Sequence, residues 1–296
     1  MTLYTQQENN VARTWVLMGV FLALVIALGW FFGRIYGEPL ILYLAIILSL
    51  AMNVVGYWFA DKIVLRLAGA RPAGRQEFFD LYTVTENLAI TAGLPLPCLF
   101  VIDDPSPNAF ATGRDKNHAV VAVTTGLLGR LERAELEGVI AHELSHIGNR
   151  DILLATVVVV LVGFVSILSD IFLRSRLGVS SGSGDGNRRG GNVLVLVGLV
   201  LAILSPLAAT LIQLAISRRR EYLADASGAL LTRYPEGLAR ALEKISQSPK
   251  PLRRVSAATA HLYLSDPTAG QTKKFFSLFA THPPLTDRIR LLREMS

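Results

Sequence analysis

The chain has 296 residues, of which 51% are hydrophobic and only 18% charged, with a mean hydropathy of +0.43. These values exclude an ordinary soluble protein and leave room for a membrane part plus one folded domain. The single cysteine, Cys98, excludes an intrachain disulfide and a thiolate-rich zinc site. The net charge of +6 does not indicate nucleic acid, because the basic residues cluster beside hydrophobic segments, where they orient a membrane protein.

The chain opens with two hydrophobic stretches, residues 15–32 and 40–60. Each has about the length that crosses the hydrocarbon core, and aromatic residues lie near their ends, as in interfacial belts. The leader has one basic residue and a second span follows at once, so a cleavable signal is not expected. We expect a pair of transmembrane helices within residues 1–62, in contact with the lipid bilayer.

A mixed region follows, which we expect to form the first half of a catalytic domain, residues 63–151. Residues 77–92 predict a helix stopped by glycine and proline. Residues 99–102 and 119–123 predict short strands, with turn residues between them. The expected fold class is therefore mainly α with a small β-sheet (α+β).

The end of this region carries an H-E-x-x-H motif, His142-Glu143-Leu144-Ser145-His146, on a predicted amphipathic helix. Residues four apart share a helix face, so both imidazoles can reach one metal ion. Glu143 is close enough to take the proton of an attacking water. The alternative, a polar histidine pair on a helix beside a membrane, explains neither the helix context nor a third ligand.

Two further hydrophobic stretches, residues 152–172 and 193–216, lie in a predicted second hairpin spanning residues 152–216. Their length favours membrane insertion over a buried hairpin of a soluble core, which predicts about four transmembrane helices in all. Basic residues after the second and fourth stretches place those segments in the cytoplasm. However, the loop at 174–191, with its Ser/Gly-rich part at 178–191, holds four arginines although this orientation places it outside. That discrepancy favours a shallow or dynamic hairpin over two full spans.

Residues 217–296 form the expected second half of the catalytic domain and begin with Glu221 and Asp225 on another predicted helix. Alone, these would be an ordinary acidic pair behind a basic run. Given the first motif, Glu221 is the expected third ligand, and two His plus one Glu leave zinc an open position for catalysis. Asp225 is expected to hold a ligand imidazole, or alternatively to pair with an arginine. Both motifs flank hydrophobic stretches, so the metal should lie within roughly 10 Å of the membrane surface.

The sequence also offers candidate substrate contacts and three further histidines. The strand at 119–123 is a candidate for binding an extended peptide by β-addition, with Val121 and Val123 as substrate-binding residues; the alternative is simple core. His118 and His261 are expected to be structural or surface residues. His282, beside two prolines, lies in a stiff segment, and spacing alone leaves its role open.

Taken together, these features resemble the HtpX family of bacterial membrane zinc metalloproteases, which are gluzincins related to CaaX prenyl proteases. The resemblance covers nearly the whole chain, including both motifs, residues 108–113 and residues 281–284. It implies a zincin-like catalytic domain with one Zn²⁺ per chain, facing the cytoplasm from the bacterial inner membrane, and quality control of damaged or misfolded membrane proteins under stress. It also implies further site residues: His282 as a catalytic group, Arg288 as an active-site neighbour, and Asn108, Ala109 and Phe110 in a substrate-side loop.

Two other function classes compete with a zinc endopeptidase. A metal transporter would place its ligands at mid-membrane depth, whereas these flank the hydrophobic stretches. A non-catalytic membrane chaperone with a structural zinc would need a fourth protein ligand, for which His282, His261 or a carboxylate is available.

Overall fold

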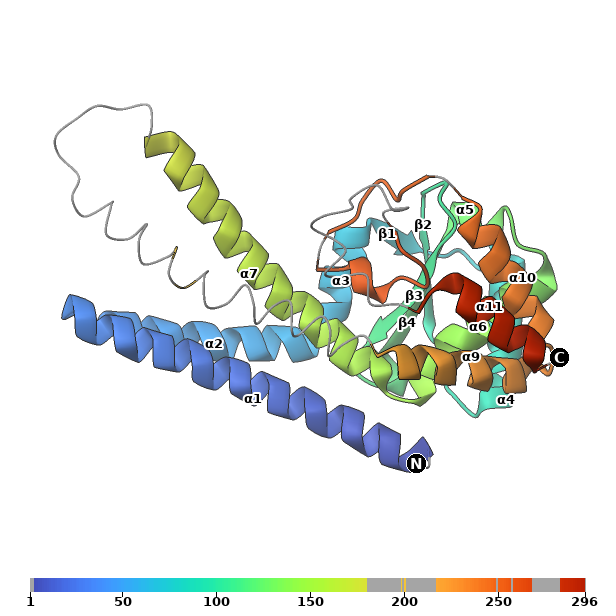
Figure 1. Ribbon diagram of the computed structural model, residues 1–296, viewed down its shortest axis with the longest axis horizontal. Helices are drawn as coiled ribbons and strands as arrows, with labels where there is room; N and C mark the ends of the chain where they lie inside the picture. Colours follow the sequence, from blue (N-terminus) through green and yellow to red (C-terminus); the bar gives the residue numbers. More distant parts are fainter. Residues whose placement is uncertain are drawn as a thin grey trace.

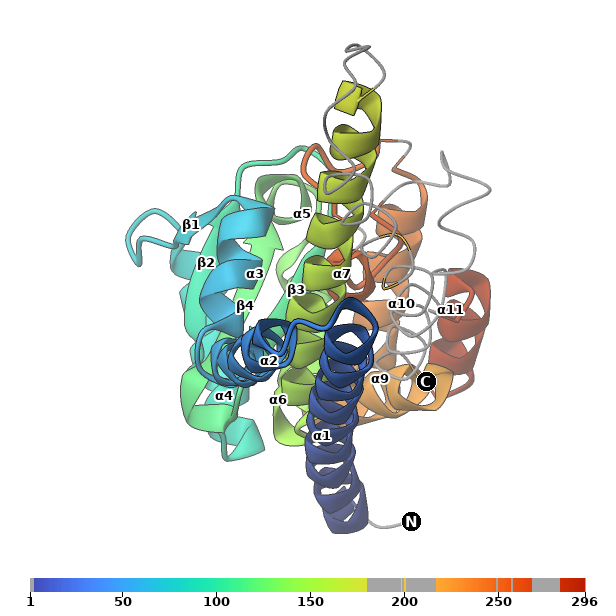
Figure 2. The same ribbon diagram turned by 90° about the vertical axis from the view of Figure 1, so that its left-hand side faces the viewer.

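The computed structural model describes residues 3–179, 198, 200, 217–248, 250–256, 258–267 and 283–295. These residues form mostly helices and one small mixed sheet, as the sequence predicts at this coarse level. Long helices extend to one side of a body in which shorter helices surround the sheet (Figure 1). Figure 2 views that body from the side of the long helices, with the sheet on one side of α7 and helices α9, α10 and α11 on the other.

Two helices form an N-terminal hairpin, α1 (Leu3–Tyr36) and α2 (Leu40–Trp58). Gly37 joins them with a φ of +67°, a left-handed conformation that glycine adopts without strain. Within the described chain, these are the two helices that are by themselves long and apolar enough to cross a membrane. Most of their apolar side chains are not covered by protein, which is what a lipid-facing surface requires. The predicted early pair of spans is therefore present as two helices.

The third hydrophobic stretch has a different role from the first two. It forms α7 (Asp151–Val179), which meets α6 (Arg133–Gly148) at a bend of 83°, and only as a bent pair do these helices qualify as a further span. The first half of α7 is buried: Leu154 and Leu161 are each 1% exposed and pack in a core shared with the hairpin. The predicted fourth stretch lies outside the described residues, apart from residues 198 and 200, and most of the Ser/Gly-rich loop does too.

The sheet has four strands in the order β1-β2-β4-β3. Strands β2 and β4 are parallel, and the two outer pairs are antiparallel. The strands predicted from sequence are β2 and β4, whereas β1 and β3 were not predicted. The bounds are Ala70–Pro72 for β1, Cys98–Ile102 for β2, Ala109–Gly113 for β3 and Ala119–Thr124 for β4.

The central strand β4 has both edges paired and both faces buried. Side chains alternate along a strand, so Val121 and Val123 pack toward α6, while Val120 and Ala122 face the core shared with α1 and α7. Val121 and Val123 are each 0% exposed. The prediction that this strand binds substrate by β-addition is wrong, because its backbone groups already pair with β2 and β3.

The predicted substrate-side loop at Asn108, Ala109 and Phe110 also needs correction. Ala109 and Phe110 begin strand β3, and all three side chains are buried. Asn108 is hydrogen-bonded to Ser265, donating to its carbonyl at 3.0 Å and accepting from its amide at 3.3 Å. Phe110 packs edge-on against Tyr263. These residues hold residues 258–267, hereafter the covering segment, rather than forming a free loop.

The remaining helices surround the sheet. The predicted helix at 77–92 is α4, and it ends at Gly93 in a left-handed conformation, as expected for a glycine C-cap. The helices are α3 (Ala60–Ala68), α4 (Phe79–Ala92), α5 (Thr125–Leu128), α9 (Arg218–Thr232), α10 (Pro235–Ser246) and α11 (Leu285–Glu294), with 3₁₀ turns at Lys116–His118 and Ala260–Leu262.

Candidate metal centre

Helix α6 presents both histidines of the H-E-x-x-H motif to one point. The helix begins with a capping box between Glu132 and Glu135, which satisfies two of its free N–H groups. The cap thereby sets the residue at which the helix starts. The Nε2 atoms of His142 and His146 are 3.1 Å apart, with their rings nearly perpendicular. His142 is 1% exposed. The shared face expected from the four-residue spacing is therefore present.

Helix α9 brings the acidic pair to the same point. It crosses α6 closely at Gly228, where an added Cβ would lie 3.0 Å from the backbone nitrogen of His142. Glu221 and Asp225 lie two turns and one turn before this crossing, on the face toward α6. One Glu221 oxygen is 3.6 Å from His146 Nε2, and the other is 3.9 Å from His142 Nε2.

The three donor groups fit a divalent metal ion. One donor atom from each of His142, His146 and Glu221 lies within 4.8 Å of the other two. Ligands at about 2.0–2.2 Å from a tetrahedral zinc are separated by roughly 3.3 Å, so only small adjustments are needed. In the part of the chain that the structure describes, no other group of His, Cys, Asp or Glu converges in this way.

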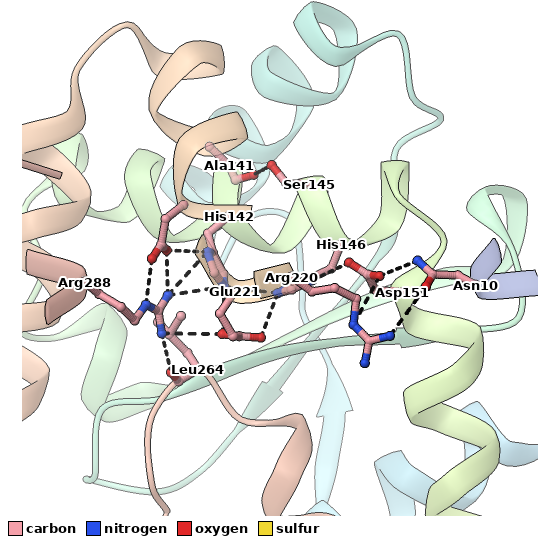
Figure 3. Close-up of polar contacts among 11 residues, drawn as sticks. Asn10, Ala141, His142, Ser145, His146, Asp151, Arg220, Glu221, Leu264 and Arg288 are labelled. Atoms are coloured by element: carbon pink, nitrogen blue, oxygen red, sulfur yellow. Dashed lines mark hydrogen bonds and ion pairs between the residues drawn. The ribbon is translucent and has the colours of Figure 1, made fainter. Parts of the chain in front are cut away.

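Asp225 and Arg288 support the first histidine. Figure 3 shows Arg288 beside His142. Asp225 Oδ1 lies 2.9 Å from His142 Nδ1, and the Arg288 guanidinium donates to both Asp225 oxygens at 2.7 and 2.8 Å. The two roles weighed for Asp225, imidazole partner and arginine partner, thus occur together. Burial raises the pKa of Asp225, but the Arg288 charge and the hydrogen bond with His142 outweigh it and lower that pKa to about 2.

Asp151 supports the second histidine, His146. This residue was not predicted from the sequence. Its Oδ2 is 3.1 Å from His146 Nδ1. Burial lowers the pKa of His146, but the bond to Asp151 and the charge of Glu221 outweigh it and raise that pKa to about 9. The available signal was local: Asp151 lies five residues beyond His146, just after Arg150, which turns the chain with a φ of 58°.

A cavity of about 40 Å³ lies beside these groups. Glu143 lines it and is 2% exposed; burial raises the pKa of its carboxyl, although the neighbouring histidines lower it. The covering segment forms part of the cavity wall, where His261 lies with its Nε2 3.1 Å from the Ala155 carbonyl. His261 is therefore buried at the site rather than on the surface. A cavity of this volume has room for a few water molecules but not for a peptide.

The other residues predicted from the sequence lie in different places. Arg288 is fully buried, beside Asp225 and His142. His282 lies outside the described residues. His118 is half exposed and pairs with Asp115 and Arg114, which agrees with a surface role.

Comparisons with known proteins identify the family of this chain. Peptidase family M48 matches residues 75–296. A protein called "Protease HtpX homolog" from Caldanaerobacter subterraneus subsp. tengcongensis is 46% identical, with 100% of this chain and 98% of the relative covered. A protein with the same name from Dictyoglomus thermophilum is 47% identical, with 99% of this chain and 95% of the relative covered. The solved structure of S. mikatae Ste24p aligns with 98% of this chain and 66% of that chain, at 20% identity and a TM-score of 0.49. The chain belongs to peptidase family M48 and is a membrane metalloprotease.

Proposed function

We propose that the metal is zinc, one ion per chain, held by His142, His146 and Glu221. The convergence of these three donors is the observation that carries the proposal. Two imidazoles and one carboxylate form a ligand set that zinc favours in hydrolases, and it leaves one position open. When bound, zinc would acidify water and polarise the scissile carbonyl.

The residues around that position would transfer the proton, orient the histidine rings and stabilise the oxyanion. Glu143, buried beside the cavity with a raised pKa, takes the proton of the attacking water and passes it to the leaving amine. Asp225 and Asp151 fix the rings of His142 and His146 through their Nδ1 atoms, which directs each Nε2 toward the metal. His282 is proposed to stabilise the developing oxyanion, on the resemblance of its motif.

The edge of β3 that faces away from β4 is the proposed docking edge for the substrate backbone. Ala109 accepts from Leu264 N at 2.9 Å and Gly113 donates to Thr156 at 3.2 Å, both on the side away from β4. Alternate residues of a strand point the same way, so the N–H and C=O of Ala111 also face outward, where Ala111 lines the cavity. An extended peptide can pair there once the covering segment moves.

Ala111→Pro tests this docking edge. Proline removes the outward N–H without disturbing the bonds to β4, so kcat/KM should fall about threefold to tenfold, the value of one hydrogen bond. Ala111→Ser keeps the N–H and serves as the control. Peptide cleavage kinetics and thermal denaturation of both variants check this. Equal kcat/KM in two equally stable variants would exclude pairing at Ala111.

The location and substrate class are also proposed. The catalytic unit, built from residues 63–151 and 217–296, faces the cytoplasm of a bacterial inner membrane, because Lys62, Arg66 and Arg71 follow the second span. The proposed ligands are on α6 and α9, and α1 contacts the turn that joins α6 to α7, so the metal would be close to the membrane helices. There it can meet segments of misfolded or damaged membrane proteins.

Cleavage by the purified full chain tests the proposed function. In detergent, it should cleave an unfolded membrane protein, lose that activity with a zinc chelator, and regain it with one equivalent of zinc. Folded soluble protein should be cut more slowly. Cleavage that persists with chelator, in a preparation free of other proteases, would contradict a zinc mechanism. Zinc binding without any cleavage would favour a chaperone, and zinc flux in proteoliposomes would favour a transporter.

A further inference from the structure

We propose that Asn10, on the N-terminal membrane helix α1, is a positioning residue for the metal centre. It acts on His146 through Asp151, so the helix that anchors the chain in the membrane also completes the metal site. This inference rests on the proposed function, since it requires His146 to be a metal ligand.

The contacts of Asn10 converge on the start of α7 (Figure 3). Asn10 is 4% exposed. Its Nδ2 donates to Asp151 Oδ1 at 2.6 Å and to the Asn149 carbonyl at 3.1 Å. Its Oδ1 accepts from Arg220 Nη1 at 3.4 Å. One amide thus joins α1 to the turn before α7 and to the residue preceding Glu221.

The two oxygens of Asp151 have separate partners. Oδ2 lies 3.1 Å from His146 Nδ1, while Oδ1 accepts from Asn10 and lies 3.7 Å from Arg220 Nε. With both oxygens held, the carboxylate plane is fixed, and so is the imidazole that it orients. Residues that hold a metal ligand's hydrogen-bond partner contribute to metal affinity by restricting the ligand to its binding orientation.

The burial of this cluster argues against an incidental contact. Asn149 and Asp151 are 6% and 7% exposed, and Arg220 is 9% exposed. Buried polar groups are costly unless they are hydrogen-bonded, so removing the Asn10 amide leaves an oxygen of Asp151 short of a donor. The carboxylate can then rotate away from His146 Nδ1.

The length of α1 explains how a membrane helix reaches the site. Its 34 residues extend about 50 Å, well beyond the roughly 30 Å hydrocarbon core. Asn10 precedes Trp15, where the hydrophobic stretch begins, by about 7 Å along the axis. It therefore lies before the hydrophobic stretch and against Asp151 at the start of α7, and metal affinity should depend on how α1 docks there.

The test is the zinc dissociation constant of the full chain in detergent, measured by chelator competition for Asn10→Ala, Asp151→Ala and the double variant. Asn9→Ala is the matched control, because Asn9 is the same residue type one position away and exposed. We expect Asp151→Ala to weaken zinc binding about 10- to 100-fold and Asn10→Ala about 5- to 10-fold. Asn9→Ala should stay within about twofold. In the Asp151→Ala background, Asn10→Ala should add less than about twofold.

The outcomes separate this inference from the proposed function. If wild type binds no zinc, both the positioning role of Asn10 and the proposed zinc-dependent function fail. If wild type binds zinc and Asn10→Ala binds it equally well, or loses the same factor with and without Asp151, only the positioning role fails. Should Asn10→Ala not fold, Asn10→Asp keeps the shape but replaces the donor with a second carboxylate, and it should weaken zinc binding at least as much. A variant with lower thermal stability and unchanged zinc affinity would show a packing role only.

Discussion

Glu143→Gln should lower peptide hydrolysis by about 10²- to 10⁴-fold while leaving one zinc per chain. The amide keeps the size of the carboxylate but cannot take a proton, so the attacking water loses its base. Zinc should stay bound because Glu143 is not among the converging donors. Single-turnover cleavage and metal analysis of the purified variant measure both effects.

Glu137→Gln is the matched control for this change. It lies on the same helix α6, but its carboxylate is partly exposed and paired with Arg133. It should cleave like wild type, within experimental error. If Glu143→Gln also retained activity, with contaminating proteases excluded, a different group would have to act as the base.

Arg288→Met should lower the free energy of unfolding by about 3–5 kcal/mol. Arg288 is fully buried and donates to both oxygens of Asp225, to the Leu264 carbonyl at 3.1 Å, and lies 3.6 Å from a Glu221 oxygen. Methionine fills the space but leaves the buried Asp225 carboxylate without its counter-charge. Thermal denaturation of the metal-free protein should show a midpoint lowered by roughly 10 °C.

Arg290→Met controls for losing an arginine from the same helix. Arg290 pairs with Glu294 in solvent, where an ion pair contributes about 0–1 kcal/mol. A second check is Arg288→Met with Asp225→Leu: removing both charges should cost less than the sum of the single changes. Additive losses, or a stable Arg288→Met protein, would mean that the buried pair does not stabilise the fold as argued.

The parts of the site that the sequence predicted are those encoded by helical spacing. His142 and His146 are four residues apart, and Glu221 and Asp225 are also four apart, so each pair shares a helix face whatever the rest of the fold. The role of Asp225 was predicted as two alternatives. The structure shows both because Arg288, 63 residues away in sequence, reaches the same carboxylate.

Contacts between distant segments could not be predicted in this way. Asn10 contacts Asp151, which is 141 residues away in sequence. A polar residue before a hydrophobic stretch does not indicate a partner at that distance. Strand β3 was not predicted, because residues 109–113 end in Thr-Gly and are buried on both faces, so they lack polar alternation. The loop expected at residues 108–110 came from the family resemblance. The strand at 119–123 was found, but its central position depends on β3 and could not be known without it.

The most direct measurement of the central claim is anomalous diffraction at the zinc edge from crystals of the full chain grown with zinc. We expect one strong peak between α6 and α9, with His142 Nε2, His146 Nε2 and a Glu221 oxygen each about 2.0–2.2 Å away and no fourth protein ligand. A peak closed by a fourth side chain would indicate a structural site. A peak elsewhere, with Glu221 turned away from both histidines, would contradict the account.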